Sequence, residues 1–169
     1  MRRYLCEGIG TFFLVFAGTG AVIANDLFGG QITHVGIALS FGFVVMAVIY
    51  AFGSVSGAHI NPAVTLGFYV IKRISLHDAI KYIISQCLGA CVASIMLAVM
   101  YQNHESLGAT LPAINVWGAF VYEFLLTWFL MMVILSVATG AKEKGLMAGV
   151  AIGGTVALEA LFAGPVTGA

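Results

Sequence analysis

Long apolar runs dominate the chain, and short polar stretches separate them. A helix needs about 20 apolar residues to cross ~30 Å of hydrocarbon. Five runs meet this length, at about 4–24, 34–53, 79–101, 116–139 and 146–163. The run at 34–53 contains no Asp, Glu, Lys or Arg. The pattern therefore predicts an all-α membrane protein with five transmembrane spans.

A sixth apolar segment, residues 61–71, is too short to span a bilayer. With roughly ten residues at ~1.5 Å each, it reaches about half-way across the hydrocarbon. Pro62 follows Asn61, and proline suits the first turn of a helix because the N–H that it lacks would be unpaired there. We therefore expect a re-entrant half-helix at 61–71, entered through a polar loop at 54–60.

The distribution of basic residues supports re-entrance. The seven Lys and Arg residues are Arg2, Arg3, Lys72, Arg73, Lys81, Lys142 and Lys144. The loops 25–33 and 102–115 contain none. If residues 61–71 do not cross, all seven fall on the side of the N-terminus, which the positive-inside rule makes cytoplasmic. If the segment did cross, Lys142 and Lys144 would face outward.

Composition narrows the function. The chain is 61% hydrophobic and 8% charged, whereas soluble domains carry roughly 25% charged residues. Its formal net charge of zero argues against a nucleic-acid partner. Cys6, Cys87 and Cys91 form no CxxC pair, so we expect membrane-buried thiols rather than a metal or redox site. Glu7 interrupts the first apolar run, so a cleaved signal peptide is not expected.

Two parts of the chain repeat. Glu7, Thr11 and Leu14 in the first span recur with the same spacing in the fourth span as Glu123, Thr127 and Leu130. An offset of 111 also aligns Gly53-Ser54-Val55-Ser56-Gly57-Ala58 with Gly164-Pro165-Val166-Thr167-Gly168-Ala169.

The repeat predicts how the chain is divided. We expect a first repeat at 1–101, an extracellular connecting loop at 102–115 and an incomplete second repeat at 116–169. Three spans in the first copy would invert the second copy, so the half-helices of the two copies would meet N-terminus to N-terminus near the midplane. A second Asn-Pro-Ala would begin at position 172, past Ala169.

The half-helix suits the passage of neutral molecules. A helix N-terminus carries roughly half a positive charge and unpaired N–H donors, which oppose cations. Asn61 adds an amide donor, and the preceding non-helical loop supplies carbonyl acceptors. Irregular backbone at this depth is tolerated where it lines a wet cavity. Water and small uncharged solutes fit this chemistry, and ions do not.

The segment Ser56-Gly57-Ala58-His59-Ile60-Asn61-Pro62-Ala63-Val64-Thr65 resembles the first signature of the aquaporin, or major intrinsic protein, family. Residues 164–169 are similar to the lead-in of its second signature, most of all in the nodulin-26-like and bacterial branches. The resemblance implies a right-handed inverted-repeat bundle, a homotetramer with one pore per subunit, and no cofactor. It also implies a passive channel in the cell (plasma or inner) membrane, in contact with the lipid bilayer.

The resemblance assigns site residues. The motif residues are Asn61, Pro62 and Ala63, and the pore-lining loop comprises Gly57, Ala58, His59 and Ile60. Two positions of the outer selectivity filter correspond to Phe41 and Ala160, and the loop-bracing carboxylates to Glu7 and Glu123. Water-selective relatives typically carry His at the position of Ala160, whereas glycerol- and metalloid-conducting relatives carry a small residue. We therefore expect a water channel that also passes small neutral solutes such as glycerol, urea and metalloid acids.

Two single residues leave alternatives open. Glu159 precedes Ala160 and has no partner that the sequence identifies, so it could brace a loop, face a subunit interface or line the pore. His59 could sense pH, or serve in the loop mainly through its carbonyl.

Other functions fit less well. An ion-coupled secondary transporter also uses inverted repeats, but it needs an ionisable site near the midplane, and the half-helix has no charge before Lys72. An enzyme is not expected, since no nucleophile–base pair or metal-ligand spacing is present. If translation ends at Ala169, the chain would be a non-conducting fragment of a channel. A longer reading frame would instead show Asn-Pro-Ala-Arg from position 172.

Overall fold

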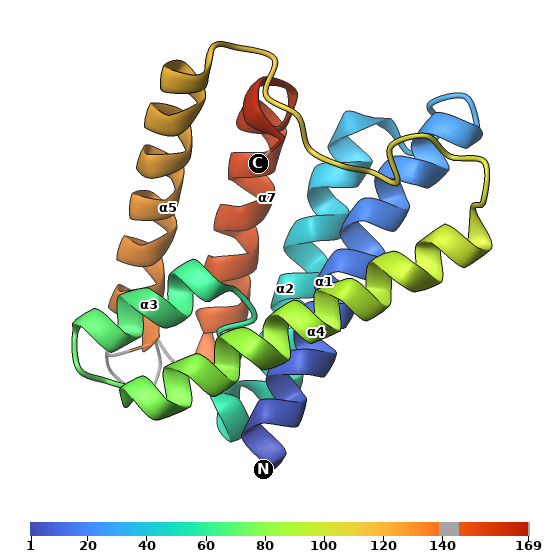
Figure 1. The fold of residues 1–169 in the computed structure, drawn as a ribbon. Helices are drawn as coiled ribbons and strands as arrows, with labels where there is room; N and C mark the ends of the chain where they lie inside the picture. The colour runs from blue at the N-terminus through green and yellow to red at the C-terminus, as the bar shows by residue number, and fades with distance from the viewer. Residues whose placement is uncertain (139–145, 169) are drawn as a thin grey trace.

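The computed structural model describes residues 1–138 and 146–168, which form a bundle of helices (Figure 1). The helices are α1 (Arg2–Leu27), α2 (Thr33–Ser56), α3 (Pro62–Val70), α4 (Leu76–Met100), α5 (Val116–Ala138) and α7 (Ala148–Thr167). Within these residues no strand occurs, and five helices, all but α3, are long and apolar enough to span a membrane. The predicted all-α class and five spans are confirmed. Lys142 and Lys144 lie outside the described residues.

The short helix α3 begins where Asn61-Pro62 predicts. Asn61 is its N-cap, and the Asn61 side chain accepts a hydrogen bond of 2.8 Å from the Ala63 N–H. Pro62 occupies the first turn, where its missing N–H has no helical acceptor to lose. With nine residues, α3 is too short to cross a bilayer. It turns back into α4 and lies beside the first part of that helix (Figure 1).

Two helix ends lie further along the chain than the sequence suggested. The loop expected at 54–60 is wrong for 54–56, which are helical in α2, and the span expected to end at 163 continues in α7 to Thr167. Each helix ends at a glycine in the left-handed region, Gly57 with φ of 88° and Gly168 with φ of 85°. A left-handed C-cap closes the last turn by a backbone bond, and this bond keeps the preceding polar residues helical.

Pro165 lies inside α7 without breaking it. A proline cannot donate to the carbonyl four residues earlier, so Leu161 loses its usual partner. His34, at the start of α2, compensates: its Nε2 lies 2.7 Å from the Leu161 oxygen. Because a carbonyl only accepts, this ring nitrogen donates. The bond ties the start of α2 to the last part of α7.

Glycines allow α2 and α7 to pack closely. A Cβ built on Gly42 would lie 2.6 Å from the carbonyl oxygen of Gly153, and a Cβ on Gly153 would lie 2.5 Å from the carbonyl oxygen of Gly42. Gly149 contacts the ring of Tyr50 in the same way. Gly149 and Gly153 therefore serve close helix packing within the subunit.

Adjacent glycines of α7 provide a matched stability test. Gly153→Ala is expected to lower the free energy of unfolding by about 1–3 kcal/mol, because its methyl group would meet backbone atoms that cannot move aside alone. Gly154→Ala should be neutral or slightly stabilising, since nothing lies within 4 Å of the added methyl and alanine favours helix. Denaturation of both variants in detergent measures the difference. Equal stability of the two would contradict the close α2–α7 contact.

Candidate functional site

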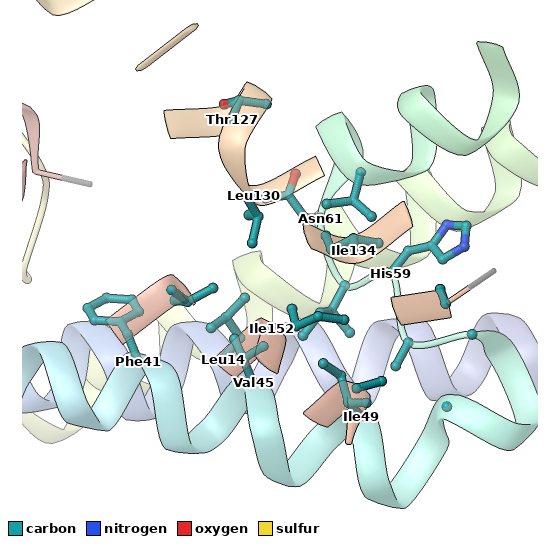
Figure 2. Close-up of a pocket in the computed structure, with 18 of the residues that line it drawn as sticks. Leu14, Phe41, Val45, Ile49, His59, Asn61, Thr127, Leu130, Ile134 and Ile152 are labelled. Carbon is teal, nitrogen blue, oxygen red and sulfur yellow. The ribbon is translucent and has the colours of Figure 1, made fainter. Parts of the chain in front are cut away.

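A cavity of about 730 Å³ lies among α1, α2, α5 and α7 and reaches the loop before α3. Its wall is mostly apolar, with side chains that include Leu14, Val45, Ile49, Leu130, Ile134 and Ile152 (Figure 2). Phe41 lies toward one end, and His59 lies at the other (Figure 2). Apolar walls with a few placed polar groups are typical of small-molecule sites.

The polar end of the cavity is the loop Gly57–Ile60, and all four residues line it. Gly57 has φ of 88°, Ala58 of 47° and Ile60 of 43°. Positive φ is rare for a residue with a side chain and is an outlier for a β-branched one such as Ile60. Such strain costs of order 1–3 kcal/mol per residue and persists only where the surroundings impose it.

Glu7 of α1 imposes the loop conformation. Its carboxylate is fully buried and accepts from two loop N–H groups, those of His59 at 3.0 Å and Ile60 at 2.7 Å. The Ser56 hydroxyl donates to the same carboxylate at 2.7 Å and accepts from the Ala58 N–H at 3.0 Å. The N–H groups of Ala58, His59 and Ile60 therefore point to Ser56 and Glu7. Among the described residues no donor bonds the carbonyls of 57–60, which leaves them available to solutes.

Gln86 and Tyr82 of α4 complete this network, and sequence reasoning missed both. Gln86 Nε2 donates to Glu7 at 2.8 Å and to Thr65 Oγ1 at 3.0 Å. The Tyr82 hydroxyl donates to the Ser56 carbonyl at 2.7 Å. The sequence does contain a signal for Gln86: a glutamine inside an apolar span rarely faces lipid, so its side chain is expected to point into the bundle. Tyr82 precedes Gln86 by four residues and shares its helix face.

His59 is held by its ring. The ring stacks on Phe68 with centroids 4.4 Å apart and meets Tyr82 edge-on at 5.2 Å. Its Nδ1 lies 3.2 Å from Thr65 Oγ1. One face of the imidazole is thus covered by Phe68, and the residue is 9% exposed while lining the cavity. His59 therefore forms a fixed part of the wall.

Asn61 presents its amide to the cavity that it lines. Its Oδ1 is used by the Ala63 N–H, so the remaining hydrogen-bonding group of the side chain is the NH₂ donor. The residue also stands at the N-terminus of α3, where the helix dipole is positive. Pro62 and Ala63 form the first turn behind it and do not line the cavity.

The two filter candidates differ in their positions. Phe41 lines the cavity, and its ring packs against Gly18 of α1. Ala160 is 5% exposed and is not among the lining residues. The preceding Glu159 lines the cavity instead, so of the three alternatives for Glu159 the geometry favours a place in the wall.

Glu123 and Glu7 share a sequence pattern but have different surroundings. Glu123 is exposed, and within residues 1–138 and 146–168 its side chain makes no hydrogen bond. It borders both the large cavity and a second hollow, which Thr110, Phe120 and Thr167 also line. The bracing role of Glu123 stays a prediction.

The sequence is similar to a known protein family and to characterised relatives over its whole length. The sequence profile of the family described as Major intrinsic protein matches residues 1–169. Over 170 residues the chain is 46% identical to Aquaporin NIP1-4 of Oryza sativa subsp. japonica and 40% identical to Nodulin-26 of Glycine max. Both alignments cover all of this chain, which spans 62% and 63% of the lengths of these relatives.

A solved structure shares the fold. The X-ray structure of the aquaglyceroporin from Plasmodium falciparum superposes with a TM-score of 0.82 at 28% sequence identity. The match covers 99% of this chain and 74% of that one. The aquaporin-like helical fold expected from the sequence is therefore confirmed.

Proposed function

We propose that this chain, which belongs to the major intrinsic protein family, forms a passive route through a membrane for water and small neutral solutes. Relatives described as aquaporins and as an aquaglyceroporin support this solute class. The chain spans about three-fifths of the curated relatives' length, so the activity of the whole protein is inferred from the part described.

One observation carries the proposal: a half-helix N-terminus and a strained loop meet in an otherwise apolar cavity. Asn61 offers an amide donor, and residues 57–60 offer carbonyl acceptors. A permeating water could exchange hydrogen bonds with both groups while the apolar wall makes none. Such a wall favours single-file passage of small hydrogen-bonding molecules.

The same end of the cavity opposes cations. The N-terminus of α3 carries roughly half a positive charge, and Asn61 adds a donor without adding negative charge. Glu7 is the nearest carboxylate to this loop, but four donors occupy its oxygens and it does not line the cavity. The field along the route near Asn61 is therefore positive.

The two filter candidates, Phe41 and Ala160, indicate the size of solute that passes. Phe41 lines one end of the cavity, and the resemblance assigns the second filter position to Ala160, a small residue without a side-chain donor that is buried and does not line the cavity here. We infer that water passes together with glycerol, urea or metalloid acids.

The topology and the assembly belong to the same proposal. We infer a cytoplasmic N-terminus, a repeat boundary within the outer loop 102–115, and a homotetramer in the cell membrane. The two-repeat division is supported by equivalent residues under the offset of 111. Gly57 and Gly168 end their helices alike, and Gly42 and Gly153 contact each other.

Asn61→Asp tests the proposal. Aspartate also caps helices well, so α3 should persist, but the new carboxylate removes the donor and offsets the positive helix end. We expect water flux to fall roughly fivefold and a cation leak to appear. Stopped-flow light scattering of proteoliposomes measures water flux, and a pH-sensitive dye inside them measures the leak.

Asn115→Asp provides the matched control. Asn115 precedes α5 and caps it in the same manner, accepting from the Gly118 N–H at 2.9 Å, yet it does not line the large cavity. Its flux should equal that of the wild type. A wild-type chain no faster than empty liposomes, or equal fluxes in both variants, would contradict the proposed function.

A further inference from the structure

Two cations converge on one aromatic ring where α1 and α4 begin. The guanidinium carbon of Arg3 lies 5.2 Å from the centroid of the Tyr4 ring, and the Nζ of Lys81 lies 5.3 Å from the same centroid. Both distances are within the range of cation–π attraction. The ring therefore holds two positive charges near each other, although like charges repel.

Hydrogen bonds and a second ring fix the position of Tyr4. Its hydroxyl donates to Asp78 Oδ1 at 2.7 Å, and Arg3 Nη2 donates to the same oxygen at 2.7 Å. The Tyr82 ring meets the Tyr4 ring edge-on with centroids 5.9 Å apart, and the Tyr82 hydroxyl is bonded to the Ser56 carbonyl. The arrangement is therefore built into the contact between α1 and α4.

We call Arg3, Tyr4, Asp78 and Lys81 the basic cluster, because it has more positive than negative charge. Asp78 supplies one negative charge to the two cations. Both cations are accessible, since the Arg3 side chain is 45% exposed and Lys81 is exposed. An anion that contacted Arg3 and Lys81 together would offset the repulsion between them.

The basic cluster lies at the level of lipid headgroups. The helix α4 has 25 residues and is about 37 Å long, whereas the hydrocarbon is ~30 Å thick, so its first residues extend past the hydrocarbon. Lys81 lies near that boundary, and a lysine stem can carry its charge to the interface. Tyrosine is enriched at the same level. The cluster therefore faces the phosphate groups of the bilayer.

The surface of α4 beyond Lys81 is apolar. Ile84 and Leu88 lie about one and two helical turns further along the same side of the helix, and they are 54% and 62% exposed. Acyl chains fit such a surface, whereas a soluble anion would use only the charges. This continuity of basic and apolar surface favours a lipid as the occupant.

We propose that the basic cluster binds the headgroup of an anionic phospholipid, with the acyl chains along α4. The phosphate accepts charge-assisted hydrogen bonds from Arg3 and Lys81. Anionic lipids are attracted to Lys and Arg beside transmembrane helices. A phosphatidylcholine headgroup also has a phosphate, but the same cations repel its quaternary ammonium group. The cluster therefore selects lipids of net negative charge.

Native mass spectrometry of the purified 169-residue chain in detergent tests the proposal. Dioleoyl-phosphatidylglycerol and dioleoyl-phosphatidylcholine are added in equal amounts, and the ratio of their bound adducts is measured. The two lipids have the same acyl chains and differ in headgroup charge. We expect phosphatidylglycerol to be bound in roughly tenfold excess, because two cations contact it. Equal binding of the two lipids would overturn the proposal.

Variants locate the binding. Lys81→Gln removes one cation and should lower the phosphatidylglycerol excess roughly fivefold, whereas Lys81→Arg should keep it. Because Lys81 is exposed, neither substitution should disturb the fold. Arg73→Gln removes the same charge from an exposed position in the connection from α3 to α4 and should keep the excess. An equal fall in Lys81→Gln and Arg73→Gln would reflect a general surface charge and overturn the site.

A competition experiment identifies the occupant. Inorganic phosphate has negative charge but no acyl chains, so at the concentration of the lipid it should displace little phosphatidylglycerol. Displacement as complete as that by unlabelled phosphatidylglycerol would assign the cluster to a soluble anion and overturn the lipid proposal. Neither measurement depends on conduction, so a chain that keeps the lipid preference but passes no water would contradict only the proposed function.

Discussion

Glu7→Ala is expected to destabilise the fold by about 3–5 kcal/mol and to abolish solute passage. The Glu7 carboxylate satisfies four buried donors, which are the N–H groups of His59 and Ile60, the Ser56 hydroxyl and the Gln86 amide. Alanine would leave these donors without partners in a membrane interior, where no water replaces them. The strained φ of Ile60 would then relax, and the loop carbonyls would leave the cavity wall.

Two further variants separate the loss of the Glu7 hydrogen bonds from the loss of a negative charge. Glu7→Gln keeps one acceptor oxygen and should cost less than Glu7→Ala, while Glu105→Ala, at an exposed position of the outer loop, should cost almost nothing. Denaturation in mixed detergent micelles gives the three free energies of unfolding. A Glu7→Ala chain within about 1 kcal/mol of the wild type would show that the carboxylate does not hold the loop.

The sequence was sufficient for the elements whose cause is local or periodic. Apolar length predicted α1, α2, α4, α5 and α7 as spans, because a bilayer requires about 20 apolar residues. The pair Asn61-Pro62 predicted the start of α3, because cap and first-turn chemistry act over a few residues. These features need no knowledge of distant contacts.

The helix ends depended on backbone conformations that the sequence suggests only weakly. Ser54 and Pro165 lie just past the expected span ends at 53 and 163, yet both are helical. Gly57 and Gly168 close those helices in the left-handed region, and His34 bonds the carbonyl that Pro165 leaves free. That last contact joins residues 127 positions apart, so no local pattern contains it.

The site network shows the same limit. Gln86 and Tyr82 meet Glu7 and Ser56 only because α4 packs beside α1. The sequence also could not predict which side chains of α7 face the cavity. The rotation of α7 about its axis, which is set by packing in the bundle, decides whether Glu159 or Ala160 does so. The spacing from the family motif placed the filter position at Ala160, and the structure shows that the adjacent Glu159 lines the cavity instead.

Blocking the cavity from one wall tests the central claim most directly. Leu130 of α5 lines the cavity, and Leu130→Trp would fill the space through which solute is proposed to pass (Figure 2). Leu125 lies on the same helix, is 49% exposed and does not line the cavity. Leu125→Trp therefore adds the same side chain outside the route.

The deciding measurement is the water permeability of proteoliposomes that contain equal amounts of the wild-type chain and these two variants. If the cavity is the route, Leu130→Trp lowers the permeability roughly twentyfold or more, to the level of empty liposomes, because the indole would occupy the space through which water is proposed to pass. Leu125→Trp keeps the wild-type value. A Leu130→Trp chain that passes water as fast as Leu125→Trp would contradict the account.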